Sequence, residues 1–208
     1  MTDNPLSVAN TALLARVRQC NLCAADLPLG PRPILQWHPD ARILIAGQAP
    51  GRKAHQANMP FADASGERLR SWLGLTAAQF YNPRLVAILP MGFCFPGSGT
   101  SGDLAPRPEC APTWQQVLLQ QLTQLQLTVV IGQYAQAYHL ADIKPTLTET
   151  VASWQDYWPD KIPLPHPSPR NNIWLKRNPW FIETVLPKLQ ARVQQLLATT
   201  NVTAVGEE

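Results

Sequence analysis

Residues 43–51 read ILIAGQAPG, an apolar run that breaks at once into a loop of glycine and proline. The run suits a buried strand at about 41–46, because parallel strands that are covered on both faces are continuously apolar. Gly47 and Pro50 interrupt regular structure, so the chain must turn there. In open α/β sheets such loops lie at the carboxyl ends of the strands, where ligands bind. The segment therefore predicts a strand followed by a binding loop.

A second segment, more than a hundred residues further on, has the same organisation. Residues 162–165 read IPLP, a short strand-like run, and residues 166–171 read HPSPRN. The prolines restrict the backbone on both sides of the histidine. A single histidine is more often structural than catalytic, but in a loop at a strand end the two interpretations have similar weight. His166 is therefore a candidate functional residue.

Two more apolar runs, at 85–89 and 127–131, predict further buried strands. Helices are expected at about 6–19, 64–73, 113–126, 133–140, 147–156 and 180–198. Gly74 should end the second helix, and Thr113 should cap the third. This alternation indicates an α/β fold, a three-layer α/β/α sandwich around a central, mostly parallel four-stranded sheet. We expect one domain over residues 1–199 and a flexible tail over 200–208.

Composition narrows the class of protein. A chain of 208 residues with 45% hydrophobic content suits one domain with one buried core. No apolar stretch approaches the ~20 residues that span a bilayer, and the N-terminus has no signal pattern, so we expect a cytoplasmic protein without a membrane partner. The net charge of +3 permits nucleic-acid binding without arguing for it.

Four cysteines have the spacing of metal ligands. Cys20 and Cys23 form a C-x-x-C pair, and Cys94 and Cys110 enclose fifteen residues rich in proline and glycine. A cytosolic chain seldom keeps disulfides, so the four thiols are better interpreted as ligands of Zn²⁺ or of an iron–sulfur cluster. Four unrelated buried thiols are the simpler alternative, with a chance of about one in four on spacing alone.

Phe61 and Asp63 lie between the two loops, directly before an expected helix. An aspartate in that place ordinarily caps the helix, and a phenylalanine ordinarily packs in the core. On local grounds these structural roles are the better interpretation of both residues.

Taken in order along the chain, these segments resemble the uracil-DNA glycosylase superfamily. Residues 47–51 are similar to its first motif, a glycine, two variable residues, a proline and a small residue, and residues 166–168 are similar to its second, His-Pro-Ser. The cysteine layout resembles that of the iron–sulfur members, families 4 and 5. Residues 63–66 resemble the Asp-x-Ser-Gly of family 5, whose aspartate is a proposed catalytic residue. The similarity spans about residues 20–171 and is greatest to a bacterial branch whose first motif reads GQAPG.

The resemblance implies a monofunctional DNA glycosylase of base excision repair, which hydrolyses the N-glycosidic bond of uracil or a related deaminated base in DNA. We expect it to act as a monomer. Asp63 and His166 would be catalytic. The base would be bound by Gly47, Gln48, Ala49 and Phe61, and the DNA by Ser168, Arg170 and Asn171. A [4Fe–4S] cluster, or zinc as the alternative, would be held by Cys20, Cys23, Cys94 and Cys110.

The chain differs from the family at positions where an acidic residue or a residue that recognises uracil is expected. Gln48 and Ala49 replace the glutamate of family 4 and the water-activating aspartate of family 1. Pro90 replaces the asparagine that reads uracil in family 4. The first loop is therefore expected to bind the base without catalysing its release. Two alternatives stay open: an iron–sulfur DNA-binding protein that has the glycosylase fold with weak or no excision, and a zinc-stapled binding module.

Overall fold

Four parallel strands form the centre of the structure, a computed structural model that describes residues 5–100 and 102–202. The strands are β1 (Ile43–Ala46), β2 (Val86–Ile88), β3 (Leu127–Ile131) and β4 (Lys161–Leu164), in the order β2-β1-β3-β4. Ile45 pairs with Ile88 on one side and with Val129 on the other. The predicted α/β sheet is confirmed, and the named strands pair only in parallel.

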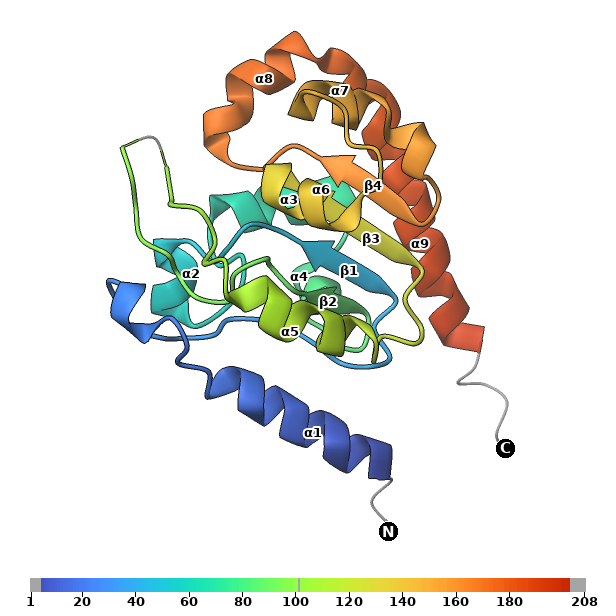
Figure 1. The fold of residues 1–208 in the computed structure, drawn as a ribbon. Coiled ribbons are helices and arrows are strands. Elements are labelled where there is room, and N and C mark those ends of the chain that lie inside the picture. The colour runs from blue at the N-terminus through green and yellow to red at the C-terminus, as the bar shows by residue number, and fades with distance from the viewer. Residues whose placement is uncertain (1–4, 101, 203–208) are drawn as a thin grey trace.

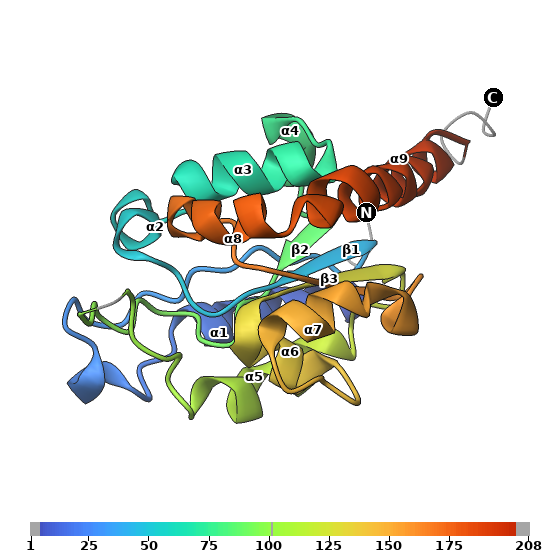
Figure 2. The same ribbon diagram turned by 90° about the horizontal axis from the view of Figure 1, so that it is seen from above.

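Helices cover both faces of this sheet, which gives three layers (Figure 2). One face carries α3 (Ala64–Leu73), α4 (Ala77–Phe80), α8 (Asn172–Arg177) and α9 (Leu186–Val202). The other carries α1 (Pro5–Arg18), α5 (Cys110–Leu119) and α6 (Gly132–His139). Helix α7 (Leu147–Ala152) packs beside the edge strand β4, and α2 (Arg52–Ala57) follows β1 (Figure 1). Short helical turns complete the chain: η1 (Ala24–Asp26), η2 (Trp154–Tyr157), η3 (Pro169–Asn171) and η4 (Phe181–Val185).

Alternate side chains of the strands enter two different cores. Ile43 and Ile45 pack with Leu69 and Trp72 of α3, whereas Leu44 packs with residues of α1 and α5. Because both faces of the strands are buried, their residues are apolar without alternation, except for Thr128 in β3 and Lys161 at the start of β4. Helix α3 has the predicted bounds, and Gly74 ends it with a φ of 65°, in the left-handed region that favours glycine.

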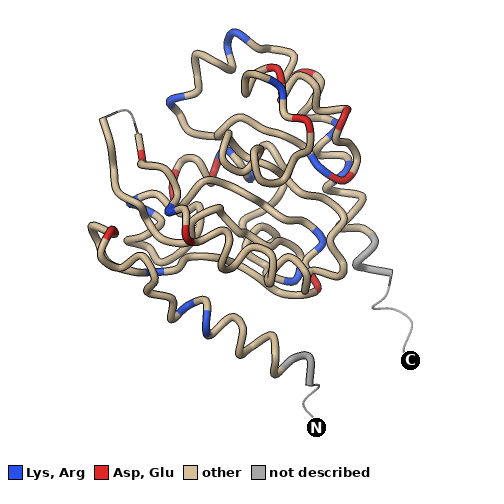
Figure 3. Tube along the Cα trace, in the orientation of Figure 1, with Lys and Arg blue, Asp and Glu red and all other residues tan. Residues whose placement is uncertain are grey.

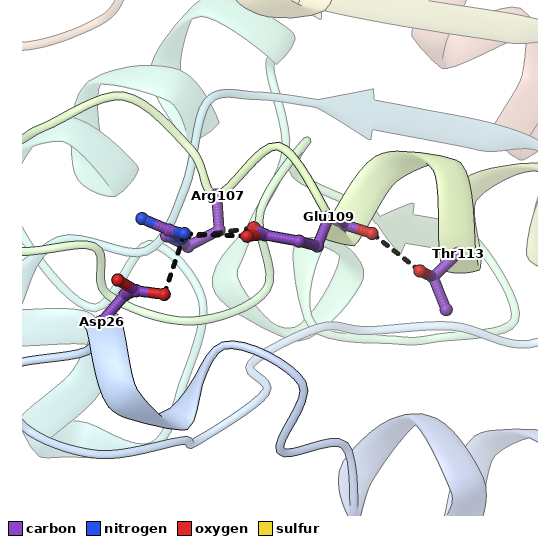
Figure 4. Close-up of polar contacts among 4 residues, drawn as sticks. All are labelled: Asp26, Arg107, Glu109 and Thr113. Atoms are coloured by element: carbon purple, nitrogen blue, oxygen red, sulfur yellow. Dashed lines mark hydrogen bonds and ion pairs between the residues drawn. The ribbon is translucent and has the colours of Figure 1, made fainter.

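Several helix predictions need correction. Thr113 does not cap α5, because the helix begins three residues earlier at Cys110; its hydroxyl donates to the carbonyl oxygen of Glu109 at 2.7 Å (Figure 4). Pro112 lies in the first turn, where a missing N–H costs little. The short helices α2, α4 and α8 were not predicted.

The C-terminal helix also ends later than predicted. Helix α9 continues to Val202, into the segment expected to be a tail, and residues 203–208 of that expected tail lie outside the described residues. Over the described part of the chain, no helix combines the length and hydropathy needed to cross a bilayer.

A buried imidazole predicts how stability depends on pH. His139 ends α6, and its Nε2 atom is buried without a hydrogen-bond partner among the described residues. Burial, assisted by the charge of Lys161, lowers the pKa of His139 to about 4. The unfolded chain takes up this proton near pH 6.5, so the unfolded state is stabilised relative to the folded state as the pH falls from there to about 4. In this window His139 should lower the free energy of unfolding by about 1.4 kcal/mol per pH unit.

Urea unfolding of the wild-type and His139→Leu proteins between pH 7 and pH 4 measures this contribution. Burial also lowers the pKa values of His55 and His166, but these residues remain in both proteins, so the difference between the two slopes isolates His139. Equal slopes would contradict the prediction.

Candidate active site

The loops that follow β1 and β4 meet at the carboxyl edge of the sheet and line one cleft of about 620 Å³. In Figure 1 this edge is on the left, where β1 leads to α2 and β4 leads to α8. The volume is typical of sites for small ligands. The cleft is lined by the residues predicted for catalysis and for binding of base and DNA: Gly47, Gln48, Ala49, Phe61, Asp63, His166, Ser168, Arg170 and Asn171.

His166 offers one defined nitrogen to a ligand. The main-chain N–H of Ser168 donates to its Nδ1 at 3.2 Å, so the neutral ring carries its proton on Nε2. Burial lowers the pKa of His166, although the negative charges of Asp63 and Asp103 oppose this shift. The amide of Asn171 donates to the carbonyl oxygen of His166 at 2.7 Å and fixes the loop. The side chain is thus a neutral N–H donor held on a braced backbone.

Asp63 is the N-cap of α3, as its position before the helix suggested. Its Oδ1 accepts a hydrogen bond from the main-chain N–H of Gly66 at 3.0 Å. The same residue lines the cleft, and its negative charge acts on His166. A carboxylate has two oxygens and accepts several hydrogen bonds, so Asp63 can cap the helix and act on a ligand at the same time.

The backbone holds Phe61 in the wall of the cleft. Its φ is 55°, a left-handed conformation that few non-glycine residues adopt. The hydroxyl of Tyr81 donates to the carbonyl oxygens of Pro60 and Phe61, both at 3.2 Å. A Cβ on Gly66 would lie 1.9 Å from the Phe61 oxygen, so only glycine fits there. The ring of Phe61 also packs edge-to-face on Phe80, with centroids 6.1 Å apart, so it belongs to both the core and the cleft.

Hydrogen bonds to its carbonyl groups hold the first loop, residues 47–51, in position. The oxygens of Gly47 and Gln48 accept hydrogen bonds from the main-chain N–H groups of Met91 and Gly92, at 2.8 and 2.9 Å. The side-chain amide of Gln48 donates to the carbonyl oxygen of Leu104 at 2.8 Å. What this loop can offer to a base is therefore its main-chain N–H groups.

Two charged residues of the cleft were not predicted from the sequence. Lys53 follows the first motif, and Asp103 lies between the third and fourth cysteines. The charge of Lys53 close behind a candidate binding loop could have marked it. Asp103 has no such local signal, because only the tertiary fold brings its segment to the cleft.

The four cysteines line one small cavity, to which α5 contributes Cys110 and Trp114. The indole N–H of Trp114 donates to the sulfur of Cys20 at 3.2 Å, and the main-chain N–H of Phe93 donates to the sulfur of Cys110 at 3.3 Å. Burial raises the pKa of Cys94 to about 11 and that of Cys110 to about 12. As they stand, no three His, Cys, Asp or Glu side chains of the described residues form a site for a single metal ion.

Arg107 also lines this cavity, and its guanidinium pairs with two carboxylates (Figure 4). Its Nη2 pairs with Asp26 at 2.9 Å and with Glu109 at 2.8 Å. Asp26 follows Cys23 in η1, and Glu109 directly precedes the last cysteine. Burial, Glu109 and Cys20 raise the pKa of Cys23, and the positive charge of Arg107 opposes them. The charge of Arg107 thus offsets part of this rise, and the pKa of Cys23 stays above its ordinary value.

The strand order β2-β1-β3-β4 puts a switch point between β1 and β3, where the connections leave in opposite directions. Fold and cleft thus define an open α/β protein with a candidate ligand site at the carboxyl edge of a parallel sheet. Residues 36–190 match the Uracil DNA glycosylase superfamily, and because this match covers more than half of the chain, the protein belongs to that superfamily. The matched range includes both loop motifs and begins after Cys20 and Cys23.

Among solved structures, the chain is similar to a solution NMR structure of a proposed uracil DNA glycosylase from Methanosarcina acetivorans. The identity is 15%, the match covers 77% of this chain and 93% of that chain, and the TM-score is 0.45.

Proposed function

We propose that the protein removes uracil, or a related deaminated base, from DNA by hydrolysing its N-glycosidic bond. The observation that carries this proposal is the single cleft in which Phe61 and Asp63, from the segment before α3, meet His166, from the loop after β4. A base inside a duplex cannot reach such a cleft, so it must be flipped out at a cost of a few kcal/mol.

Each group of the cleft has a part in this reaction. Phe61 stacks on the extruded base, and the main-chain N–H groups of Gln48 and Ala49 bind its edge. When the glycosidic bond breaks, negative charge develops on the base, and the Nε2–H of His166 stabilises it. Asp63 stabilises the positive charge on the sugar. DNA phosphates are contacted by Ser168, Arg170 and Asn171.

One observation favours a second candidate, a DNA-binding protein that does not excise. Ala49 carries no acid, and one oxygen of Asp63 already caps α3. Such a protein would have the stacking ring and the histidine donor, and Asp63, the one acid in the predicted set, would serve as the cap of α3 alone.

A base-release assay separates the two candidates. Duplexes with one uracil, hypoxanthine, xanthine or thymine are incubated with the protein, and abasic sites are converted to strand breaks with alkali. Release of a deaminated base, with no release of thymine from a T·A pair, supports the glycosylase. Tight binding to the uracil duplex without any release selects the binding protein.

We also propose that the cysteines hold a [4Fe–4S] cluster. Three features support it. The four cysteines line one cavity, and N–H groups donate to the sulfurs of Cys20 and Cys110. Burial also makes a thiolate at Cys110 unfavourable unless a positively charged group such as a metal compensates it. Iron–sulfur clusters are held by four cysteine thiolates. Bound there, a cluster would supply covalent anchoring of the segments around Cys20–Cys23 and Cys94–Cys110.

Removal of one sulfur tests this assignment. The purified protein is expected to be brown with about four iron atoms per chain, and Cys110→Ser should lose the iron and unfold at a lower temperature. Leu22→Ser is the matched control, because Leu22 also lines the cavity but is no ligand. Metal analysis and absorption spectra give the answer. One zinc per chain and no iron would refute the cluster and select the zinc alternative.

A further inference from the structure

A hairpin between the third and fourth cysteines reaches over to the first motif. The main-chain N–H of Leu104 donates to the oxygen of Gly97 at 2.9 Å, and that of Gly99 donates to Gly102 at 2.6 Å. In Figure 1 it belongs to the green loop at the left. The hydrogen bond from the Gln48 amide to Leu104 fastens it to the loop after β1.

This hairpin places a second carboxylate in the cleft. Oδ1 of Asp103 accepts a hydrogen bond from the hydroxyl of Ser98 at 3.1 Å. Oδ2 lies 3.2 Å from the point where a Cβ on Gly51 would stand, so it is turned to the first motif. The negative charge of Asp103 acts on His166, as that of Asp63 does. Asp103 is exposed, and unlike Asp63 it is not the N-cap of a helix.

Asp103 meets a need that the predicted residues leave open. Hydrolysis requires a proton acceptor for the attacking water, and such a group contributes about 10²–10⁴-fold to a rate. Ala49 has no acceptor in its side chain, and Asp63 gives Oδ1 to the main-chain N–H of Gly66. Asp103 stands beside the same first loop and on the same cleft.

We propose that Asp103 is the general base that activates water in this cleft, a role that rests on the proposed glycosylase function. The water oxygen bonds to C1′ of the sugar while its proton passes to the Asp103 carboxylate. The C1′–N bond breaks, and its electron pair leaves with the base, which is hydrogen-bonded to His166. The base then takes a proton from solvent, and Asp103 returns its own proton to solvent. Asp63 balances the positive charge of the sugar throughout.

Asp103→Asn in the full-length protein tests this role. Under single-turnover conditions on a uracil duplex, base release should slow by about 10²-fold or more. The Kd for a duplex with a tetrahydrofuran abasic analogue should stay within about threefold of wild type, since the general base acts on water. Asp160→Asn is the matched control. It removes the same charge from an exposed residue directly before β4, at the opposite edge of the sheet, and should keep the wild-type rate.

Two further measurements separate a base from a residue that only holds the hairpin. Added formate should restore part of the rate of Asp103→Ala, because a free carboxylate can accept the proton, and it should leave the wild-type rate of Asp160→Asn unchanged. By NMR, the titration midpoint of His166 should fall in Asp103→Asn, because the charge of Asp103 raises the pKa of that ring.

The outcomes are distinct. A slow Asp103→Asn protein with normal DNA affinity supports the role. If wild type releases uracil and Asp103→Asn does so within threefold of its rate, the role of Asp103 is overturned and the glycosylase function stands. A rate loss matched by an equal loss of DNA affinity also overturns it. If wild type releases no base from any duplex, the proposed function and the role of Asp103 both fall.

Discussion

His166→Ala is expected to slow base release by about 10²–10³-fold, because one preorganised donor to a developing anion contributes about 2.7–4 kcal/mol. The structure supports this size of effect through the hydrogen bond from Ser168, which fixes the tautomer with its proton on Nε2. Burial lowers the pKa of His166, which favours the neutral ring, so the Nε2–H group can donate a hydrogen bond while the ring stays neutral. Single-turnover rates on a uracil duplex measure the change.

Two variants sharpen this result. His166→Gln places an amide N–H near the position of Nε2 and should retain more activity than His166→Ala. His38→Ala removes a histidine that precedes β1, at the far edge of the sheet, and should behave as wild type. Wild-type rates in His166→Ala would show that the base leaves without this donor.

Asp63→Asn is expected to have the second large effect, a loss of about 10²-fold or more in the rate of base release. Asparagine is as good an N-cap as aspartate, so the hydrogen bond to Gly66 and the stability of α3 should be preserved. The variant therefore removes the negative charge beside the sugar cation and little else. Asp63→Ala should lose the cap as well, at about 0.5–2 kcal/mol of unfolding free energy.

Urea unfolding and single-turnover kinetics on the same samples separate the two roles of Asp63. The expected pattern is a stable but slow Asp63→Asn protein and a less stable, slow Asp63→Ala protein. An Asp63→Asn protein with the wild-type rate would leave Asp63 as a helix cap alone.

The sheet could be predicted because its strands are buried on both faces. Runs of mostly apolar residues such as 127–131 can be recognised as strands without an alternating pattern. A single residue, Gly74, is enough to predict the end of α3. The short helices could not be found in this way. Helix α2 has six mostly polar residues and α4 has four, too few to show a helical period. Helix α4 has one local signal, the capping box of Thr76 and Gln79, but four residues are too few to form a helix without tertiary packing.

The residues of the site also differ in whether local sequence or tertiary contacts place them. His166 and the first loop follow strands directly, so the sheet topology alone places them at one edge. Asp103 reaches that edge through tertiary contacts such as the hydrogen bond between Gln48 and Leu104, which are 56 residues apart in the chain. The local interpretation of Asp63 as a cap was right, but it did not reveal that the capped helix begins at the wall of the cleft.

The packing of Gly66 against Phe61 limits how this protein can diverge. Position 66 has no room for any side chain, because even a methyl group would overlap the backbone of residue 61. The side chain at position 61 is under no such restriction from its neighbour. Substitutions can therefore change the aromatic side chain at position 61, whereas the backbone position that presents this side chain to a base is fixed. Among relatives, glycine at 66 should persist where the aromatic residue at 61 has been exchanged for another.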